Sequence, residues 1–473
     1  MSTPYSSVDP ASSPRPLWTG PGAALAAVVA LAAALRLPGL HYGLPYSLLN
    51  PDEGSIVPRA WEMVHGGGLD PGWYDYPSLL LELLAPFQAL ADSPSYLSAR
   101  YLAVLIGLAG VVAAWWLGRR AYGGSAGVVA ASVVAVSTTH VAYSHVAVTD
   151  VLLTLGVTCT LALLATGRLE WAGVAAGLAV SAKYPGVFLA APLLAVGWGR
   201  WRRLVVAAGL AVAAFALTSP FVVVHPGRAW DDLSRVQRLA RTGWLGFEDD
   251  GSAFGAFSTR LWDAVGPVLI IALVGLVAAL VRRSRADLAL ASFGLVYFAD
   301  LLTLDAHFDR YVLPLVPVVA VLAARLRALA PVTLLLLVIP LVWSIRDDRE
   351  LLKTDTRVFA QPYVEQLVPA GASIAMDPST IPLAGREVLS LELPGPGRTT
   401  DPNRNVAALR ARGIELVLLT GAVEDRVLAA RDRYPREAAF VDELRATAKQ
   451  VLYTQRGAGE LAGPWVALYR LGG

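Results

Sequence analysis

The chain has 473 residues, of which 55% are hydrophobic and 16% are charged, and its formal net charge is +2. Soluble domains usually carry about 25% charged residues, so this composition excludes an ordinary soluble protein. The small net charge gives no indication of nucleic-acid binding. The single cysteine, Cys159, excludes an intramolecular disulfide and a cysteine metal cluster.

The hydropathy pattern divides the chain into three parts. Residues 1–16 form a polar tail, and no small-residue cleavage site is obvious after the first apolar run, which predicts an uncleaved first span. Long apolar stretches then alternate with short Arg-rich turns over residues 17–345, which predicts a transmembrane domain. Residues 346–473 have the composition of soluble sequence and predict a small α/β domain.

About eleven transmembrane helices are expected, several of them short. A helix needs about 20 apolar residues to cross the hydrocarbon core, and about 17 can suffice. The candidate spans are residues 17–37, 101–117, 125–139, 151–166, 171–182, 186–198, 204–224, 264–281, 286–304, 312–324 and 329–345.

The orientation follows from lysine and arginine residues in the short loops, because cytoplasmic loops carry the excess. Arginines cluster at alternate loops throughout this pattern, for example at Arg119–Arg120 and Arg282–Arg283. We therefore expect a cytoplasmic N-terminus and an extracytoplasmic C-terminal domain. The pattern holds only if residues 79–91, which are apolar but short, form a helix in the outer interface instead of a span.

A lysine interrupts one apolar stretch. Residues 171–198 must cross twice and are broken by Lys183-Tyr184-Pro185-Gly186, where proline and glycine should end one helix and start the next. A charge near this depth is costly and is by default a functional-site hypothesis. The alternative is that Lys183 snorkels to the interface.

Two acidic groups fall on the outer face in this topology. Asp52 and Glu53 follow the first span, and Asp150 starts the fourth. Carboxylates at the mouth of a membrane cavity can supply a general base, or hold a metal or an acceptor hydroxyl. Helix capping is the alternative for each of them.

Three basic groups fall on the same face, namely Arg100, Lys183 and Arg310. Guanidinium and ammonium groups at the edge of an apolar bundle suit a lipid phosphate, which needs charge neutralisation where water is scarce. Interfacial anchoring is the alternative, and the convergence of acidic and basic groups on one face weighs against it.

The six histidines form no persuasive metal site, and no glycine-rich loop indicates a nucleotide. No cofactor is specified, although a divalent metal stays open.

The order of these motifs resembles a known family. An acidic pair, Tyr76-Pro77-Ser78, Arg100, Leu117-Gly118-Arg119-Arg120 and Thr149-Asp150 are followed by Ala182-Lys183-Tyr184-Pro185-Gly186 and Asp309-Arg310-Tyr311-Val312-Leu313-Pro314. Over residues 17–345 this order resembles the C-class (GT-C) glycosyltransferases of the protein-mannosyltransferase and aminoarabinose-transferase superfamily.

The resemblance implies a polyprenyl-phosphate sugar donor and an inverting transfer at the outer face. Asp52 matches the first-loop acidic residue, with Glu53 beside it, and Asp150 matches the second acidic position. Arg100 and Lys183 match basic residues near the active site, and Arg310 joins them as a phosphate ligand, while Tyr76, Tyr184 and Tyr311 are expected to position substrate. The chain departs at Tyr76-Pro77-Ser78, where relatives often have Lys or His before Pro-Pro, so part of the substrate contact differs.

Two further segments have predicted roles. The long loop over residues 225–263 is expected to form a partly amphipathic lid over the cavity. In the C-terminal domain, residues 373–377, 415–420 and 466–471 are predicted strands, and residues 403–412 and 423–434 are predicted helices. This domain shows no catalytic constellation, and it is expected to cover the cavity, bind the acceptor or support folding.

Two other functions compete with glycosyl transfer. A transporter or lipid flippase would show internal repeats and a polar site near the bilayer midplane, whereas here no repeat is clear and the polar groups cluster at one face. A membrane scaffold would not need an acidic pair and a lysine beside a cavity. The expected partners are the membrane, a polyprenyl-phosphate sugar and a lipid, cell-envelope glycan or protein acceptor, with no nucleic acid.

Overall fold

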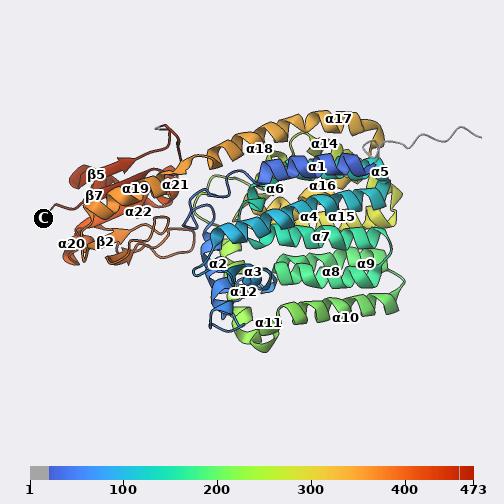
Figure 1. The fold of residues 1–473 in the computed structure, drawn as a ribbon, viewed down its shortest axis with the longest axis horizontal. Coiled ribbons are helices and arrows are strands. Elements are labelled where there is room, and N and C mark those ends of the chain that lie inside the picture. The colour runs from blue at the N-terminus through green and yellow to red at the C-terminus, as the bar shows by residue number, and fades with distance from the viewer. Residues whose placement is uncertain (1–20, 458, 473) are drawn as a thin grey trace, which may run out of the picture.

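The computed structural model describes residues 21–457 and 459–472. A helical body is followed by a C-terminal unit that contains all the described strands and lies beyond one end of the body (Figure 1). The predicted tail over residues 1–16 lies outside the described residues.

The helical body extends from residue 21 to residue 351. Its first nine α-helices are α1 Pro21–Arg36, α2 Pro51–Val64, α3 Leu79–Gln88, α4 Tyr96–Tyr122, α5 Gly124–Val136, α6 Thr138–Ser144, α7 Thr149–Ala165, α8 Leu169–Ala182 and α9 Ala190–Gly197. The next nine are α10 Trp201–Thr218, α11 Pro220–Val224, α12 Pro226–Thr242, α13 Ala253–Val265, α14 Val268–Arg282, α15 Arg285–Leu301, α16 Val316–Ala324, α17 Ala330–Leu336 and α18 Val338–Leu351. Three 3-10 helices, η1 Tyr184–Leu189, η2 Asp309–Leu315 and η3 Arg327–Leu329, connect them.

Small residues let the long helices pack closely. Gly173 and Gly177 on α8 face the backbone of Ala207 and Ala211 on α10, and a Cβ at either glycine would collide with it. Glycines four residues apart on an apolar helix permit this approach because they lie on one helix face. Helices α1, α4, α7, α8 and α10 consequently run side by side, whereas α2, α3, α11 and α12 gather at the end nearest the C-terminal unit (Figure 1).

The chain is a polytopic membrane protein, although helix length supports fewer crossings than predicted. Three described helical segments are long and apolar enough to cross a membrane, namely Tyr96–Tyr122, Trp201–Thr218 and Arg327–Leu351, and two bent helix pairs raise this number to five. Five further apolar helices have 10–17 residues. Within the described residues, every predicted span overlaps one helix or a run of consecutive helices, but several are too short to count by length alone.

Two predicted local features are present. Helix α8 ends at Ala182, and η1 begins at Tyr184 with Pro185 in its first turn, so the chain breaks where proline and glycine predicted it. Residues 79–88 of the predicted interfacial segment form the separate helix α3, and its place in the outer interface stays a prediction. The predicted lid over residues 225–263 contains the amphipathic helix α12, a segment without regular structure, and the start of α13.

The C-terminal unit is built on a five-stranded mixed sheet in the order β3-β2-β4-β7-β5. Strand β2 pairs in parallel with β3 and β4, and β7 pairs antiparallel with β4 and β5. A separate parallel pair joins β1 and β6. The elements are β1 Thr354–Asp355, α19 Thr356–Leu367, β2 Ser373–Met376, β3 Glu387–Ser390, α20 Val406–Ala411, β4 Leu416–Thr420, α21 Gly421–Ala429, α22 Pro435–Thr447, β5 Lys449–Thr454, β6 Leu461–Ala462 and β7 Val466–Arg470.

Helices cover both faces of this sheet. One face packs against α19, through residues such as Ala360 and Val364, and the other packs against α20 and α22, through residues such as Leu409 and Phe440. Alternate residues of β4 supply the two cores, as the period of a strand requires. Strands β2, β4 and β7 and helices α20 and α21 coincide with predicted elements, whereas β3, β5, α19 and α22 were not predicted.

Candidate active site

Asp52 lies in the first turn of α2, at the end of the helical body nearest the C-terminal unit (Figure 1). The side chain of Asn50 caps this helix by accepting a hydrogen bond from the backbone N–H of Asp52. The Asp52 carboxylate itself is 24% exposed and does not serve as the cap. Its Oδ2 accepts a hydrogen bond of 3.0 Å from the Tyr76 hydroxyl and lies 3.7 Å from Nη2 of Arg310.

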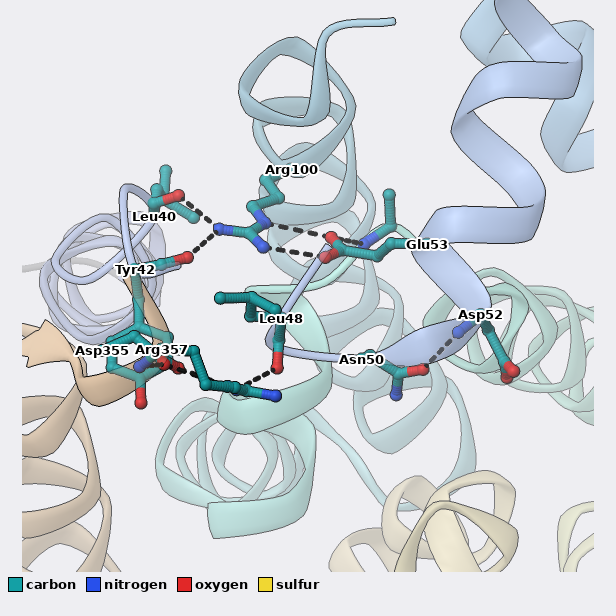
Figure 2. Close-up of polar contacts among 10 residues, drawn as sticks. Leu40, Tyr42, Leu48, Asn50, Asp52, Glu53, Arg100, Asp355 and Arg357 are labelled. Carbon is teal, nitrogen blue, oxygen red and sulfur yellow. Dashed lines mark hydrogen bonds and ion pairs between the residues drawn. The ribbon is translucent and has the colours of Figure 1, made fainter. Parts of the chain in front are cut away.

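The neighbouring carboxylate points elsewhere. Glu53 is turned toward Arg100 on α4, and Asp52 is turned away from that arginine (Figure 2). Nε and Nη2 of Arg100 donate to the two carboxylate oxygens of Glu53 over 3.0 and 2.8 Å, and both side chains are fully buried. Nη1 of Arg100 donates to the carbonyls of Leu40 and Tyr42.

Four of the five N–H donors of the buried Arg100 are thus used within the protein. Glu53 is equally occupied, because its Oε1 also accepts a hydrogen bond from the backbone N–H of Ala147. The geometry therefore does not support the predicted catalytic role of Glu53 or the predicted phosphate-binding role of Arg100. The physical reason is the helical geometry of α2, which sends adjacent side chains to different sides.

Lys183 and Asp150 form a second buried ion pair. Nζ of Lys183 lies 2.6 Å from Oδ1 of Asp150, with side-chain exposures of 9% and 3%. Asp150 stands in the first turn of α7, and Lys183 is the extended residue between α8 and η1. The second oxygen of Asp150 has no hydrogen-bond partner among the described residues.

Two tyrosines link this ion pair to Asp52. The ammonium group of Lys183 lies 5.3 Å from the ring centroid of Tyr76 and 5.7 Å from that of Tyr311. Such distances are in the range of cation–π attraction. Because the hydroxyl of Tyr76 donates to Asp52, one side chain touches both charged groups.

Arg310 supplies the second cation of the cluster. It belongs to η2, and its guanidinium lies 4.3 Å from the ring of Phe308 and 5.8 Å from that of Tyr311. Its Nε is buried and has no hydrogen-bond partner among the described residues. The neighbouring Asp309 accepts hydrogen bonds from the Tyr143 hydroxyl and from the backbone N–H of Arg310. Arg310 thus keeps a donor for a ligand.

A small inner cavity of about 70 Å³ adjoins this cluster, with Tyr76, Asp150, Lys183, Tyr184 and Tyr311 in its wall. A larger outer cavity of about 910 Å³ lies beside it. The two cavities share five lining residues, Tyr184, Pro185, Leu233, Gln237 and Asp300. The arrangement forms a site with a narrow polar end and a wide outer part, and helix α12 lines both.

Some lining residues were not predicted. Tyr297 and Asp300 on α15 line the inner cavity, and the Tyr297 hydroxyl donates to the backbone carbonyl of Tyr311. Gln237 on α12 lines both cavities. Asp300 could have been predicted from the sequence, because a charged residue interrupts an apolar helix there. Nothing in the sequence distinguished Tyr297 from an ordinary core tyrosine. Among the residues that the structure describes, no three His, Cys, Asp or Glu side chains are placed to share a metal ion.

Sequence comparison indicates the class of enzyme. The model of glycosyltransferase family 87 matches residues 73–304, which include α12 and most of the cavity wall. The protein is a C-class membrane glycosyltransferase. No curated protein matches this glycosyltransferase in sequence.

Solved structures share the fold of this glycosyltransferase at low identity. ArnT from Cupriavidus metallidurans in the apo state has a TM-score of 0.59 and 14% identity, covering 94% of this chain and 97% of that chain. The same protein bound to undecaprenyl phosphate has a TM-score of 0.57 and 15% identity, with the same coverages. Archaeal oligosaccharyltransferase AglB from Archaeoglobus fulgidus, with an inhibitory peptide and a dolichol-phosphate, has a TM-score of 0.55 and 12% identity, covering 92% of this chain and 73% of that chain.

Proposed function

We propose that this glycosyltransferase moves a sugar from a polyprenyl-phosphate donor to an acceptor hydroxyl at the outer membrane face, with inversion at the anomeric carbon. The observation that carries the proposal is that Asp52 and Lys183, 131 positions apart by their numbers, contact the same side chain, Tyr76, beside the inner cavity. Binding of undecaprenyl phosphate to ArnT and of dolichol-phosphate to AglB supports the donor class.

Asp52 is the proposed general base. Its carboxylate takes the proton of the acceptor hydroxyl while the hydroxyl oxygen forms a bond to the anomeric carbon. The bond between that carbon and the phosphate oxygen breaks, and the phosphate leaves with the electron pair. The partial exposure of Asp52 and its hydrogen bond from Tyr76 support this role, because a base must be both accessible and oriented.

Lys183 and Arg310 are the proposed ligands of the donor phosphate. Both cations lie in a poorly hydrated setting where they can stabilise the negative charge that grows on the leaving phosphate. Asp150 holds Lys183 in place and, with its second oxygen free, can accept a hydrogen bond from a sugar hydroxyl. Tyr76, Tyr184 and Tyr311 shape the inner cavity for the sugar.

Glu53 and Arg100 are proposed as positioning residues. Their bidentate contact ties α2 to α4, and the Arg100 bonds to Leu40 and Tyr42 fix the loop before α2. This arrangement sets the direction from which Asp52 faces Tyr76 and Arg310. We further propose eleven spans over residues 17–345, a cytoplasmic N-terminus and an extracytoplasmic unit over residues 346–473, since this topology puts the site on the outer face.

The test uses purified protein in nanodiscs, a panel of radiolabelled polyprenyl-phosphate sugars and a membrane lipid extract as acceptor. Transfer is expected with wild type and is expected to fall in Asp52→Asn by about 10²–10⁴-fold, the usual contribution of a general base. Glu62→Gln is the matched control, because Glu62 is an exposed residue on the same helix. Absence of transfer from every donor by folded wild type would contradict the proposal.

A further inference from the structure

The outer cavity is lined by residues from both parts of the chain. Helix α12 contributes Arg238 and Arg241, and the segment after β3 of the C-terminal unit contributes Pro396, Gly397 and Arg398. The backbone of this segment packs closely on the end of α12, because a Cβ added at Gly397 would lie 3.3 Å from the side chain of Thr242. The C-terminal unit is therefore part of the cavity wall.

The charges of this wall are mostly positive. Arg235 is paired with Asp75 and Asp232. In contrast, no carboxylate of the described residues forms an ion pair within 4.0 Å of Arg238, Arg241 or Arg398. The lining of the outer cavity contains one carboxylate, that of Asp300.

The position of Arg398 is fixed. Its guanidinium lies 4.7 Å from the ring of Trp244, and its Nη1 donates to the backbone carbonyl of Leu393. Stacking on an indole ring orients a guanidinium and leaves its outer N–H groups available. The side chain is thus presented to the cavity and still has donors to offer.

Buried polar residues hold both ends of the Arg398 segment. Asp401 accepts hydrogen bonds from the backbone N–H groups of Glu392 and Asn403, each over 2.8 Å. Arg404 donates to the Glu392 carbonyl and forms a 2.7 Å ion pair with Glu424, in which both side chains are fully buried. Buried hydrogen bonds and an ion pair therefore hold this loop of the C-terminal unit in place. Arg398 is the cation that the loop contributes to the lining of the outer cavity.

Apolar side chains form the rest of the wall. Val187 and Phe188 from η1 and Trp230 from α12 line the cavity, and Val187 and Trp230 are 58% and 67% exposed. A cavity lined by both arginines and apolar residues suits an amphiphile with an acidic head. Its volume of about 910 Å³ is within the range of sites for such molecules.

We propose that Arg238, Arg241 and Arg398 bind an acidic group of the acceptor, and that the acceptor is an anionic lipid. This inference rests on the proposed function. It assigns the acidic group to the acceptor because the proposed function already assigns Lys183, in the wall of the inner cavity, and Arg310 to the donor phosphate. The C-terminal unit then completes the acceptor site through Arg398.

The experiment separates a membrane lipid extract by anion exchange into acidic and neutral fractions and offers each as acceptor in mixed micelles. Wild type is expected to transfer sugar to the acidic fraction alone. Arg398→Ala and Arg241→Ala are expected to raise the apparent KM for that fraction about tenfold, since each removes charge-assisted hydrogen bonds. The KM for the donor and kcat should change little.

Two further variants make the result specific. Arg398→Lys keeps the charge and should recover most of the lost affinity, which a purely structural role of the arginine would not produce. Arg436→Ala, an exposed arginine of the same unit, should behave as wild type. Equal transfer to the neutral fraction, or a raised KM for the donor instead of the acceptor, would overturn the acceptor site while leaving the proposed function intact. No transfer with any fraction or donor would overturn both.

Discussion

Lys183 Nζ lies 2.6 Å from Asp150 Oδ1 at the junction of α8 and η1, and both side chains are almost completely buried. Burial of two charges is costly, and their mutual attraction repays that cost only when the pair stays intact. Removing either partner leaves an uncompensated charge. A role in catalysis must therefore be separated from a role in stability.

Single and double substitutions make this separation. Lys183→Met alone is expected to lower stability by about 3–5 kcal/mol because Asp150 is left buried and unpaired. Lys183→Met combined with Asp150→Leu should recover most of that stability. Transfer should stay at least about 100-fold below wild type in the double variant, because the phosphate has lost a cation. Thermal unfolding in detergent and the transfer assay measure the two effects, and a double variant with restored transfer would contradict the proposed role of Lys183.

Tyr76 tests the link between the base and the cation. Tyr76→Phe keeps the ring beside Lys183 but removes the hydroxyl that donates to Asp52. We expect kcat to fall about tenfold or more, since one hydrogen bond to a charged group contributes about 1.5–3 kcal/mol. Tyr46→Phe, which alters a tyrosine outside the cavity lining, is the comparison variant. An unchanged kcat would mean that Asp52 is oriented by other groups.

Glu53 and Arg100 should respond differently from Asp52. Arg100→Met leaves a fully buried carboxylate, so stability should fall by about 3–5 kcal/mol. Asp52→Asn alters a partly exposed carboxylate that lies 3.7 Å from Arg310, and it should lower stability by less than Arg100→Met does. Urea or thermal unfolding of the two proteins distinguishes the buried pair from the catalytic group. A stable Arg100→Met variant with lost transfer would instead restore Arg100 to the phosphate site.

The sequence could indicate the cluster of charged residues on the outer face. It could not show which of them belong to the proposed site and which form a buried structural ion pair. Lys183 and Asp150 stood out because charges are rare in apolar segments. Asp52 and Glu53 looked equivalent, since which side of α2 meets α4 depends on contacts with Arg100, 47 positions away. The cavity wall formed by α12 and the C-terminal unit depends on contacts between residues that lie still farther apart in the sequence.

The fold, too, could be predicted where a local sequence pattern decides it and not where distant contacts do. Apolar stretches predicted the helices of the body because burial in lipid or protein leaves a strong compositional signal. The buried strands β2, β4 and β7 were recognisable by their apolar residues. Strand β3 lies at a sheet edge with a largely exposed pattern, and its four residues, EVLS, carry little hydrophobic periodicity. Helix lengths could not decide the number of crossings, because several apolar helices are short or bent.

The proposed topology can be tested with single cysteines. Cys159→Ser removes the one native thiol, and Arg202→Cys and Arg436→Cys then report the predicted cytoplasmic and outer sides. In intact cells a membrane-impermeant maleimide is expected to label position 436 and not position 202, and both after permeabilisation. Labelling of position 202 in intact cells would invert the orientation derived from the arginine-rich loops.

The stability of the C-terminal unit should depend on pH through Asp377. This carboxyl follows β2 and is 1% exposed. Burial raises its pKa above the ordinary value of about 3.9, the charge of Glu424 raises the pKa further, and Arg404 opposes both effects. The folded unit therefore binds this proton more tightly than the unfolded chain does.

The sign of the pH effect follows from that difference. The contribution of Asp377 to stability is complete below its ordinary pKa and is lost as pH rises through the raised pKa of the folded state. None of the six histidines lies in the C-terminal unit, so no imidazole masks this titration. In the full-length protein, protection factors of β2 and β4 amides, corrected for intrinsic exchange, should be lower at about pH 8 than at about pH 5. Asp377→Asn should weaken the dependence and the exposed control Asp432→Asn should not, whereas a wild type with pH-independent protection would contradict the assignment.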